Sequence, residues 1–298
     1  MYVILGASGN TGHIAAKTLL SRGKTVRAVG RSAEHLQPLM AQGAEAFIAD
    51  ITDESALAKA FDRAEAAYVM LPPNPASNDF RGFQERISDS IAKAAKKSGV
   101  KNIVALSSIG ADKTSGTGPV VGLHDFEEKL NQLAANVLSL RAGYFMENTL
   151  PQVGVIRAMH SAVGPLRADL KVPMIATQDI GAAAADALTE LTFRGKQTLE
   201  LQGQRDLDYS EATTIIGNAI GRPKLGYIHA PDDQIRAALV QSGMSDSFAG
   251  LILEMAAALN SGHMRALESR GPRNTTPTPF EAFVRQRFVP AYQEKVAA

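Results

Sequence analysis

The chain of 298 residues contains no cysteine and no tryptophan. The lack of cysteine excludes disulfides, thiolate metal ligands and a cysteine nucleophile, and we expect no metal site. The lack of tryptophan means that a substrate pocket has to be built from phenylalanine, tyrosine, methionine and aliphatic side chains. Protein classes that depend on disulfides or on thiol chemistry are therefore excluded.

The sequence also has no large excess of positive or negative charge and no long apolar run. The formal net charge is only +1, so the composition gives no reason to expect nucleic acid or an anionic membrane as a partner. No apolar run reaches the about eighteen residues of a membrane-spanning helix, and the chain begins with a strand pattern rather than a signal segment. We therefore expect a cytoplasmic protein, either a monomer or a homodimer.

The first residues, MYVILGASGNTG, carry the most informative pattern. An apolar run ends at Leu5, glycines follow at positions 6, 9 and 12, and an apolar helix pattern comes after them. A strand that ends in such a turn and leads into a helix is typical of a loop that holds the phosphates of a dinucleotide. The spacing is G-x-x-G-x-x-G rather than the more familiar G-x-G-x-x-G. The alternative is an ordinary strand–turn–helix link that binds nothing.

Each glycine of this loop has its own expected role. Gly6 permits a sharp turn, Gly9 lacks the Cβ that would block a pyrophosphate, and Gly12 lets the helix pack closely on the strand. The N–H groups of Gly9, Asn10 and Thr11 would then face the phosphates, together with the positive end of the helix dipole. The predicted phosphate-binding residues are Gly6, Ser8, Gly9, Asn10, Thr11 and Gly12.

Strand and helix patterns alternate through the first half of the chain, which predicts an α/β fold. The apolar, β-rich runs lie at 2–5, 25–29, 46–48, 67–71, 102–106 and 136–140. Helical patterns lie near 12–22, 33–41, 54–62, 81–98 and 122–135. Six strands with five crossovers make a doubly wound parallel sheet, the Rossmann arrangement. We therefore predict a dinucleotide-binding domain over residues 1–142.

The pattern changes after residue 142, where we predict a smaller C-terminal α/β lobe, residues 143–298, packed on the first domain. Its strands are expected at 198–203 and 224–231, and its helices near 179–188, 210–221, 232–242, 246–261 and 279–287. Particular residues mark helix ends: Asp53, Asp179 and Ser210 are predicted to cap the starts of helices, and Gly99 is predicted to end one.

The second predicted strand ends in VRAVGRS, where enzymes that use NAD carry an Asp or Glu for the ribose hydroxyls. This chain has no acid there; Arg31 and Ser32 offer a guanidinium and a hydroxyl, which suit a 2′-phosphate. The pattern favours NADP(H) over NAD(H) as the cofactor, unless Arg31 is only a solvated surface residue. Arg27 is a second candidate, less favoured because of strand alternation.

The third and fourth strands also end in candidate cofactor contacts. Asp50 ends the third predicted strand, where it could accept a hydrogen bond from an adenine amine or cap the next turn. Leu71, Pro72 and Pro73 follow the fourth strand and are expected to line the adenosine side. The alternative is that the prolines only mark a loop.

Ser107 and Ser108 end the fifth predicted strand, at the sheet edge where ligands bind in this fold. Either Ser107 positions a substrate carbonyl beside the cofactor, or these hydroxyls satisfy the backbone of the turn. A short-chain dehydrogenase would next show a Tyr and, four residues later, a Lys that helps the Tyr to protonate the carbonyl oxygen. This chain has no Tyr between residues 69 and 143, and the stretch GLHDFEEKL places Glu128 four residues after His124. His124 is a candidate substitute acid, a substrate contact, or a structural residue at a helix start.

The segment RAGYFMENTL follows the sixth predicted strand, within reach of a nicotinamide ring. Tyr144 and Phe145 could stack on that ring or on a planar substrate, and Tyr144 is a catalytic candidate beside Ser107 and His124. The alternative is that Tyr144, Phe145 and Met146 are core residues.

Together these segments resemble the NmrA-like group of atypical short-chain dehydrogenase/reductases. The matching pieces are GASGNTG, VRAVGRS, RAGYFMEN, PMIATQDIGAAAADAL and LQGQRDLDYSEATTIIGNAIGRP, and the resemblance runs from residue 1 to about residue 290. It implies the Rossmann fold and a nicotinamide dinucleotide. His124 matches the group's usual departure from Tyr, and Asn148 matches a polar position of its motif. The group contains NADPH-dependent reductases of quinones and of triphenylmethane dyes, and also redox-sensing regulators without known chemistry.

Two functions therefore stay open. The first is an NADPH-dependent reductase that transfers hydride to a small-molecule acceptor, quinone-like or otherwise conjugated. Such an acceptor needs little help from a protein acid, because its reduced oxygens are comparatively stable as anions. The second is a non-catalytic NADP(H) redox sensor that regulates a protein partner, for which the missing acid pair is expected.

Overall fold

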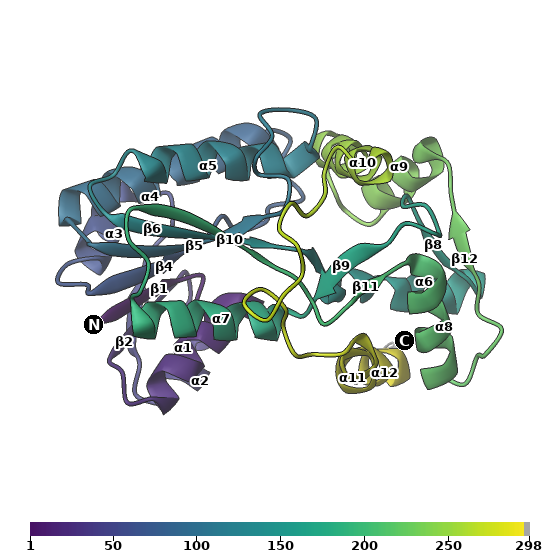
Figure 1. The fold of residues 1–298 in the computed structure, drawn as a ribbon, viewed down its shortest axis with the longest axis horizontal. Coiled ribbons are helices and arrows are strands. Elements are labelled where there is room, and N and C mark those ends of the chain that lie inside the picture. Colours follow the sequence, from purple (N-terminus) through teal and green to yellow (C-terminus); the bar gives the residue numbers. More distant parts are fainter. Residues whose placement is uncertain (295–298) are drawn as a thin grey trace.

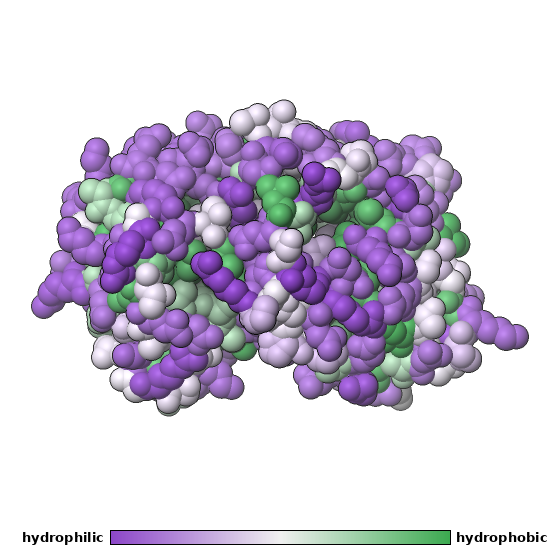
Figure 2. All heavy atoms as spheres, in the orientation of Figure 1, coloured by the Kyte–Doolittle hydropathy of each residue, from purple (hydrophilic) through white to green (hydrophobic). Residues whose placement is uncertain are grey.

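The computed structural model describes residues 1–294, which form two adjoining lobes (Figure 1). The central sheet and its helices make up the larger lobe, and the smaller lobe holds the short strands and helices of the second half. Hydrophilic residues cover most of the face drawn in Figure 2, with hydrophobic residues visible in smaller patches between them. In the described part of the chain, no helix is both long and apolar enough to cross a membrane.

The larger lobe is built on a sheet of seven parallel strands in the order β10-β6-β5-β4-β1-β2-β3. The strands are β1 (Tyr2–Leu5), β2 (Val26–Gly30), β3 (Glu45–Ile48), β4 (Ala66–Val69), β5 (Asn102–Ser108), β6 (Asn136–Ala142) and β10 (Lys196–Leu201). The chain order reverses between β1 and β4. In such a sheet, ligands bind beyond the carboxyl ends of the strands next to this reversal. The doubly wound α/β fold predicted from the sequence is confirmed.

Helices cover both faces of the sheet (Figure 1). One face carries α1 (Asn10–Ser21), α2 (Ala33–Met40) and α7 (Thr177–Glu190); the other carries α3 (Glu54–Ala60), α4 (Phe80–Ser98) and α5 (Val121–Asn131). Each face has its own core, and consecutive residues of β1 alternate between them. Ile4 belongs to the core under α1 and α7, whereas Val3 and Leu5 belong to the core under α3, α4 and α5. A strand that is buried on both faces is apolar throughout, which is why the run at the start of the chain has no polar residue.

The sheet has one strand more than the six that the sequence predicted. The additional strand is β10, which we expected in the smaller lobe; it pairs in parallel with β6. The helix before it, α7, packs against α1 so closely that a Cβ on Gly181 would lie 2.6 Å from the carbonyl oxygen of Thr11. Two elements beyond residue 142 therefore belong to the sheet and its helical layer. A parallel edge strand carries no local mark of its partner, so the sequence did not reveal this return.

Two of the predicted helix ends are confirmed and two are wrong. Asp53 caps α3, and Gly99 ends α4 in a left-handed conformation with φ 70°. Asp179 does not begin α7; it lies inside the first turn, where its carboxylate is buried. Ser210 does not begin α8 (Tyr209–Ala219) either, because Asp208 provides the cap two residues earlier. For α8 a neighbouring side chain took the predicted role, whereas the first turn of α7 is bound by Glu147, which is distant in sequence.

The smaller lobe contains two short sheets, β11-β9-β7 and β12-β8. Its strands are β7 (Tyr144–Phe145), β8 (Ala162–Gly164), β9 (Val172–Ile175), β11 (Asp206–Leu207) and β12 (Tyr227–His229). Its helices are α6 (Gln152–Met159), α8, α9 (Asp232–Gln241), α10 (Asp246–Ser261), α11 (Phe280–Phe283), the π-helical turn η3 (Val284–Phe288) and α12 (Val289–Gln293). Of the 3-10 turns, η1 (Gly118–Val120) directly precedes α5 and η2 (Met146–Thr149) directly follows β7. A third core, which includes Met174, Tyr209 and Phe280, fills this lobe.

The segment between α10 and α11 returns to the larger lobe and covers its open edge. The N–H of Gln202, just after β10, donates to the carbonyl oxygen of Asn274 at 2.7 Å, and the N–H of Thr276 donates back to Gln202 at 2.9 Å. The buried carboxylate of Asp179 accepts hydrogen bonds from the N–H and the hydroxyl of Thr278. An uncovered edge strand is a template for pairing with other chains, so this contact protects the sheet as well as joining the lobes.

Candidate functional site

Two cavities share walls at the carboxyl edge of the sheet. The first, which we call the loop cavity, has a volume of about 490 Å³, and its walls include Gly6, Ser8, Gly9, Arg31, Asp50 and Thr52. The second, the apolar cavity, has a volume of about 370 Å³, and its walls include Leu106, Ser107, Tyr144, Phe145, Phe248 and Met264. Met70, Pro72 and Pro73 line both, so the two cavities adjoin each other along these residues.

The glycine loop opens into the loop cavity. Gly6 has φ +62°, a left-handed conformation that favours glycine, and it forms the turn after β1. A Cβ on Gly12 would lie 2.4 Å from the carbonyl oxygen of Gly6, so this position has to stay bare for α1 to start close to the strand. A Cβ on Gly9 would meet only the Gly6 carbonyl oxygen, at 3.2 Å, and otherwise point into open space. The space beside Gly9 is therefore a cradle that a side chain would fill, which fits the approach of a phosphate.

One of the N–H groups expected to face a phosphate is already engaged. The N–H of Gly9 donates to the carbonyl oxygen of Gly6 at 2.9 Å and closes the turn, so the prediction for this group is wrong. Asn10 and Thr11 are the first residues of α1. The residue at the N-cap position of this helix is Gly9, so no side chain of the capping residue binds the free N–H groups there. The hydroxyl of Thr11 accepts a hydrogen bond from Tyr68 at 2.8 Å and is buried. The positive end of α1 stays available for an anion through its backbone.

Arg31 and Asp50 lie together on the wall of the loop cavity. Asp50 accepts hydrogen bonds from the hydroxyl and the N–H of Thr52, at 2.6 and 2.8 Å. These bonds lower the pKa of Asp50, and the charge of Arg31 lowers it further. Of the two roles predicted for Asp50, the structure shows the turn cap. Arg31 is exposed and makes no hydrogen bond or ion pair with any other described residue, so its guanidinium is free to contact an anion.

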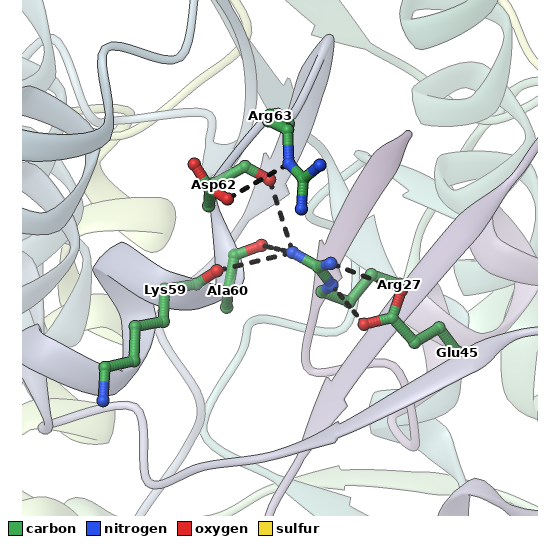
Figure 3. A network of polar contacts seen from close by, with 6 residues as sticks. All are labelled: Arg27, Glu45, Lys59, Ala60, Asp62 and Arg63. Carbon is green, nitrogen blue, oxygen red and sulfur yellow. Dashed lines mark hydrogen bonds and ion pairs between the residues drawn. The ribbon is translucent and has the colours of Figure 1, made fainter.

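Arg27, the second candidate for a phosphate contact, is fully engaged elsewhere (Figure 3). Its guanidinium binds the carboxylate of Glu45 at 2.8 Å and the carbonyl oxygen of Ala60 at 2.7 Å. The side chain is only 14% exposed. Arg27 therefore ties β2 to β3 and to the end of α3, and its prediction as a cofactor ligand is wrong.

The apolar cavity lies over the carboxyl ends of β4, β5 and β6, and α10 closes it from the side of the smaller lobe. Leu71 lines this cavity and does not line the loop cavity. Pro72 lines both cavities. Phe248 of α10 packs on Phe80 at the start of α4, with ring centroids 4.6 Å apart. Aromatic, methionine and aliphatic side chains thus form most of the wall, as the lack of tryptophan predicted.

Both serines at the end of β5 line the apolar cavity with their protons already committed. The hydroxyl of Ser107 donates to the carboxylate of Glu127 at 2.5 Å, and that of Ser108 donates to the carbonyl oxygen of Ile109 at 2.9 Å. Ser108 thus satisfies the backbone of the turn, which was the second of the two roles considered for these hydroxyls. Ser107 has no proton left for a substrate carbonyl in this arrangement, which contradicts the other interpretation.

His124 is held away from the apolar cavity. Its Nδ1 lies 2.9 Å from the carbonyl oxygen of Ala111, a contact in which the nitrogen donates. Its neighbour Leu123 lines the apolar cavity, whereas His124 is not among the residues that line it. The geometry supports the structural interpretation of His124 and not its role as an acid.

The segment after β6 brings Tyr144, Phe145 and Asn148 to the wall of the apolar cavity. Met146 is 1% exposed and belongs to the core of the smaller lobe, as the alternative for this residue held. The hydroxyl of Tyr144 accepts a hydrogen bond from Tyr209 at 3.1 Å. Burial raises the pKa of Tyr144 above that of an ordinary tyrosine, so its hydroxyl keeps its proton.

Several residues of the site were missed by the sequence analysis. Phe248, Met255 and Leu259 of α10, and Met264 after it, line the apolar cavity. Their helix was predicted, but its position over the sheet depends on tertiary packing that no local pattern reveals. Glu147 was missed too: its carboxylate accepts hydrogen bonds from the N–H and hydroxyl at the start of α7. The resemblance did contain the signal, since RAGYFMEN and ATQDIG are the two segments that this contact joins.

Comparison with known proteins agrees with this architecture. A profile described as the NmrA-like family matches residues 2–281. An NAD(P)H azoreductase of Xenophilus azovorans is 25% identical over 275 residues, covering 92% of this chain and 93% of the azoreductase. An NADPH-dependent quinone oxidoreductase of Escherichia coli, solved with NADPH, superposes with a TM-score of 0.81 at 24% identity, covering 95% of this chain and 98% of the other. The triphenylmethane reductase of Citrobacter sp., solved with NADP(H), gives a TM-score of 0.79 at 20% identity, covering 96% and 99%.

These matches extend along nearly the whole chain and include both lobes. The solved structures share the fold, and the family profile spans the glycine loop, the segment after β6 and the helix α7 that Glu147 caps. The resemblance predicted from the sequence is confirmed: the chain belongs to the NmrA-like family.

Proposed function

We propose that the protein is an NADP(H)-dependent reductase that transfers a hydride to a small conjugated acceptor of the quinone type. The observation that carries the proposal is the pair of adjoining cavities, in which a loop cavity suited to phosphates lies next to an apolar cavity lined by aromatic and methionine side chains. A dinucleotide needs both environments, because its phosphates are charged and its nicotinamide ring is flat and mostly apolar.

The residues present fit such a cofactor. The bare position at Gly9 and the open end of α1 would hold the pyrophosphate, and Ser8 lies on the same wall. Arg31 would bind a 2′-phosphate, which favours NADP(H) over NAD(H) because an uncharged ribose gives the guanidinium nothing to pair with. When bound, the reduced cofactor supplies the hydride.

The residues of the apolar cavity would position the acceptor rather than protonate it. Tyr144, Phe145, Phe248 and Met264 supply aromatic rings and a thioether to its wall. The raised pKa of Tyr144 makes its hydroxyl a weak proton donor, and His124 is bound to the backbone. A quinone-like acceptor tolerates this, since general acid catalysis contributes only about 10²–10⁴-fold and a reduced quinone is comparatively stable as an anion. Holding the two reactants together then supplies most of the rate.

The names of the relatives support this class of acceptor. Quinones, azo compounds and triphenylmethane dyes, named for the oxidoreductase, the azoreductase and the reductase above, are all conjugated molecules that a flat apolar cavity accommodates. The cavity lining favours a planar acceptor without strong charge.

The test is oxidation of NADPH by the purified protein with a panel of quinones, an azo dye and a triphenylmethane dye. We expect turnover above about 1 s⁻¹ with at least one quinone, near the low end for enzymes. The Gly9→Val variant is the matched control and should give none. Tight binding of NADPH without turnover for any acceptor would contradict the proposal and favour the alternative, a redox sensor. That alternative draws on one observation: His124 and Ser107 are both engaged within the protein.

A further inference from the structure

A buried polar cluster under the apolar cavity has no part in the function proposed above. It consists of Ser107 in β5, Arg141 in β6 and Glu127 in α5. Ser107 and Arg141 face each other in register across the two strands. The carboxylate of Glu127 accepts two hydrogen bonds from Arg141, at 2.6 and 3.0 Å, and one from Ser107 at 2.5 Å. Glu127 and Ser107 are 4% and 2% exposed, so water does not compete for these bonds.

The cluster determines which way the Ser107 hydroxyl points. A carboxylate can only accept hydrogen bonds, and the two oxygens of Glu127 each accept one from Arg141. The hydrogen bonds with Glu127 in turn raise the pKa of Arg141, so its guanidinium keeps its charge. The only proton in the contact between Ser107 and Glu127 is therefore the serine's own. What remains on the Ser107 oxygen, at the wall of the apolar cavity, is its capacity to accept a hydrogen bond.

An acceptor at this place discriminates between the two molecules that the cavity would hold. The oxygens of a quinone only accept hydrogen bonds, and they would be repelled by an oxygen that has no proton to offer. The carboxamide of a nicotinamide ring carries an NH₂ group and has protons to donate. Met70 and Pro72 line both cavities and Ser107 lines the apolar one, so a cofactor whose phosphates lie in the loop cavity would extend its nicotinamide half to this side.

We propose that Glu127 and Arg141 are positioning residues that hold Ser107 as the hydrogen-bond acceptor for the carboxamide NH₂ of the nicotinamide ring. The inference rests on the proposed binding of NADP(H) and adds how the ring is oriented. With its carboxamide held, the ring presents one defined face to the acceptor instead of rotating in an apolar wall. Ser107 is thus a cofactor residue in this chain, and it does not donate to a substrate carbonyl.

The test measures binding rather than turnover, with NADP⁺ and its 3-acetylpyridine analogue as probes. The analogue replaces the amide NH₂ by a methyl group and so lacks the donor. We expect the Ser107→Ala variant to bind NADP⁺ about three- to tenfold more weakly than the natural protein, the net value of one hydrogen bond, with the analogue almost unaffected. The Ser107→Thr variant keeps a hydroxyl and should retain the preference for NADP⁺. Ser108→Ala is the matched control, because Ser108 lines the same cavity but binds its own turn.

The role of the pair is tested by removing both charges together, with Glu127→Leu and Arg141→Met in one variant, so that no buried charge is left alone. With the pair gone the hydroxyl can rotate, and the preference for NADP⁺ over the analogue should fall by about the same three- to tenfold as in Ser107→Ala. The Ser107→Ala and Ser107→Thr variants test the role of Ser107 whether or not this double variant folds.

Equal losses for both probes in Ser107→Ala, or no loss for either, would overturn the inference while leaving the proposed function intact. A natural protein that binds neither probe would instead refute the proposed function, and with it this inference. The two failures are therefore distinguishable by the affinity of the unaltered chain.

Discussion

Arg31 is the residue that should determine which dinucleotide the protein prefers. It is exposed on the wall of the loop cavity and makes no hydrogen bond or ion pair within residues 1–294, so its guanidinium can bind a 2′-phosphate. A hydrogen bond to a charged group contributes about 1.5–3 kcal/mol, so Arg31→Ala should weaken NADPH binding about tenfold or more and leave NADH nearly unchanged. Titration with both dinucleotides measures this. Lys101→Ala, an exposed charge at the opposite end of β5, is the control, and equal losses for NADPH and NADH would show Arg31 to be structural.

Gly9 and Gly12 should respond to the same substitution in different ways. At Gly9 the backbone is extended, with φ −86° and ψ 172°, and a side chain would point into the loop cavity. Gly9→Val should therefore fold, with an unchanged circular dichroism spectrum, and bind no measurable NADPH. At Gly12 a Cβ would press on the Gly6 carbonyl oxygen, so Gly12→Val should lower the thermal unfolding temperature. If Gly9→Val still bound NADPH, the pyrophosphate would not bind beside Gly9.

His124 should matter for stability and little for the reaction. Its contact with Ala111 ties the start of α5 to the loop after β5. His124→Ala should lower the free energy of unfolding by about 0.5–1.5 kcal/mol, the net value of one hydrogen bond. Urea unfolding gives this number, and turnover with quinones and with a carbonyl substrate should change little. A large loss of turnover confined to the carbonyl substrate, at unchanged stability, would restore His124 as an acid.

The segment after β6 acts as an element, because it places Tyr144 and Phe145 on one wall of the apolar cavity. Phe145→Ala should keep NADPH affinity within about threefold and lower turnover about tenfold, because a lost aromatic wall loosens the geometry of transfer while the phosphates still anchor the cofactor. Steady-state kinetics and NADPH titration check the two halves. The control is Phe47→Ala, because Phe47 lies in β3, where its ring packs under the guanidinium of Arg27. Binding lost with folding intact would place Phe145 beside the adenosine half instead.

Elements whose partners are close in sequence were predictable, and those whose partners are distant were not. The strands β1 to β6 are apolar runs that end in turns, and Asp53 and Gly99 mark helix ends through their own side chain or backbone. The residues of the glycine loop and Arg31 follow from their place after strands. In contrast, nothing near His124 reveals that Ala111 binds it, and nothing in α10 reveals that it covers β5. The role of Asp179 depends in the same way on a segment about a hundred residues further along the chain.

The larger lobe depends on the second half of the chain for its own completion. Ile180, Leu188 and Leu201 are buried in the same core as Leu19 of α1, and β10 covers the edge of β6. We therefore expect that a fragment of residues 1–142, the domain predicted from the sequence, does not fold cooperatively. Each buried aliphatic side chain contributes about 1.5–3 kcal/mol, so the loss of three removes about 4–9 kcal/mol from a typical total of 5–15 kcal/mol.

Urea unfolding followed by circular dichroism measures this directly, with the full chain as the control. The full chain should show one sigmoidal transition whose midpoint rises with NADPH, since a ligand at a hundred times its dissociation constant adds about 2.7 kcal/mol. The fragment should show a gradual change without a transition and no response to NADPH, although it retains the glycine loop, Arg31 and Asp50. A cooperative, NADPH-dependent transition in the fragment would mean that the domain is stable without α7 and β10. Its absence would mean that the dinucleotide site exists only when the chain returns to the sheet.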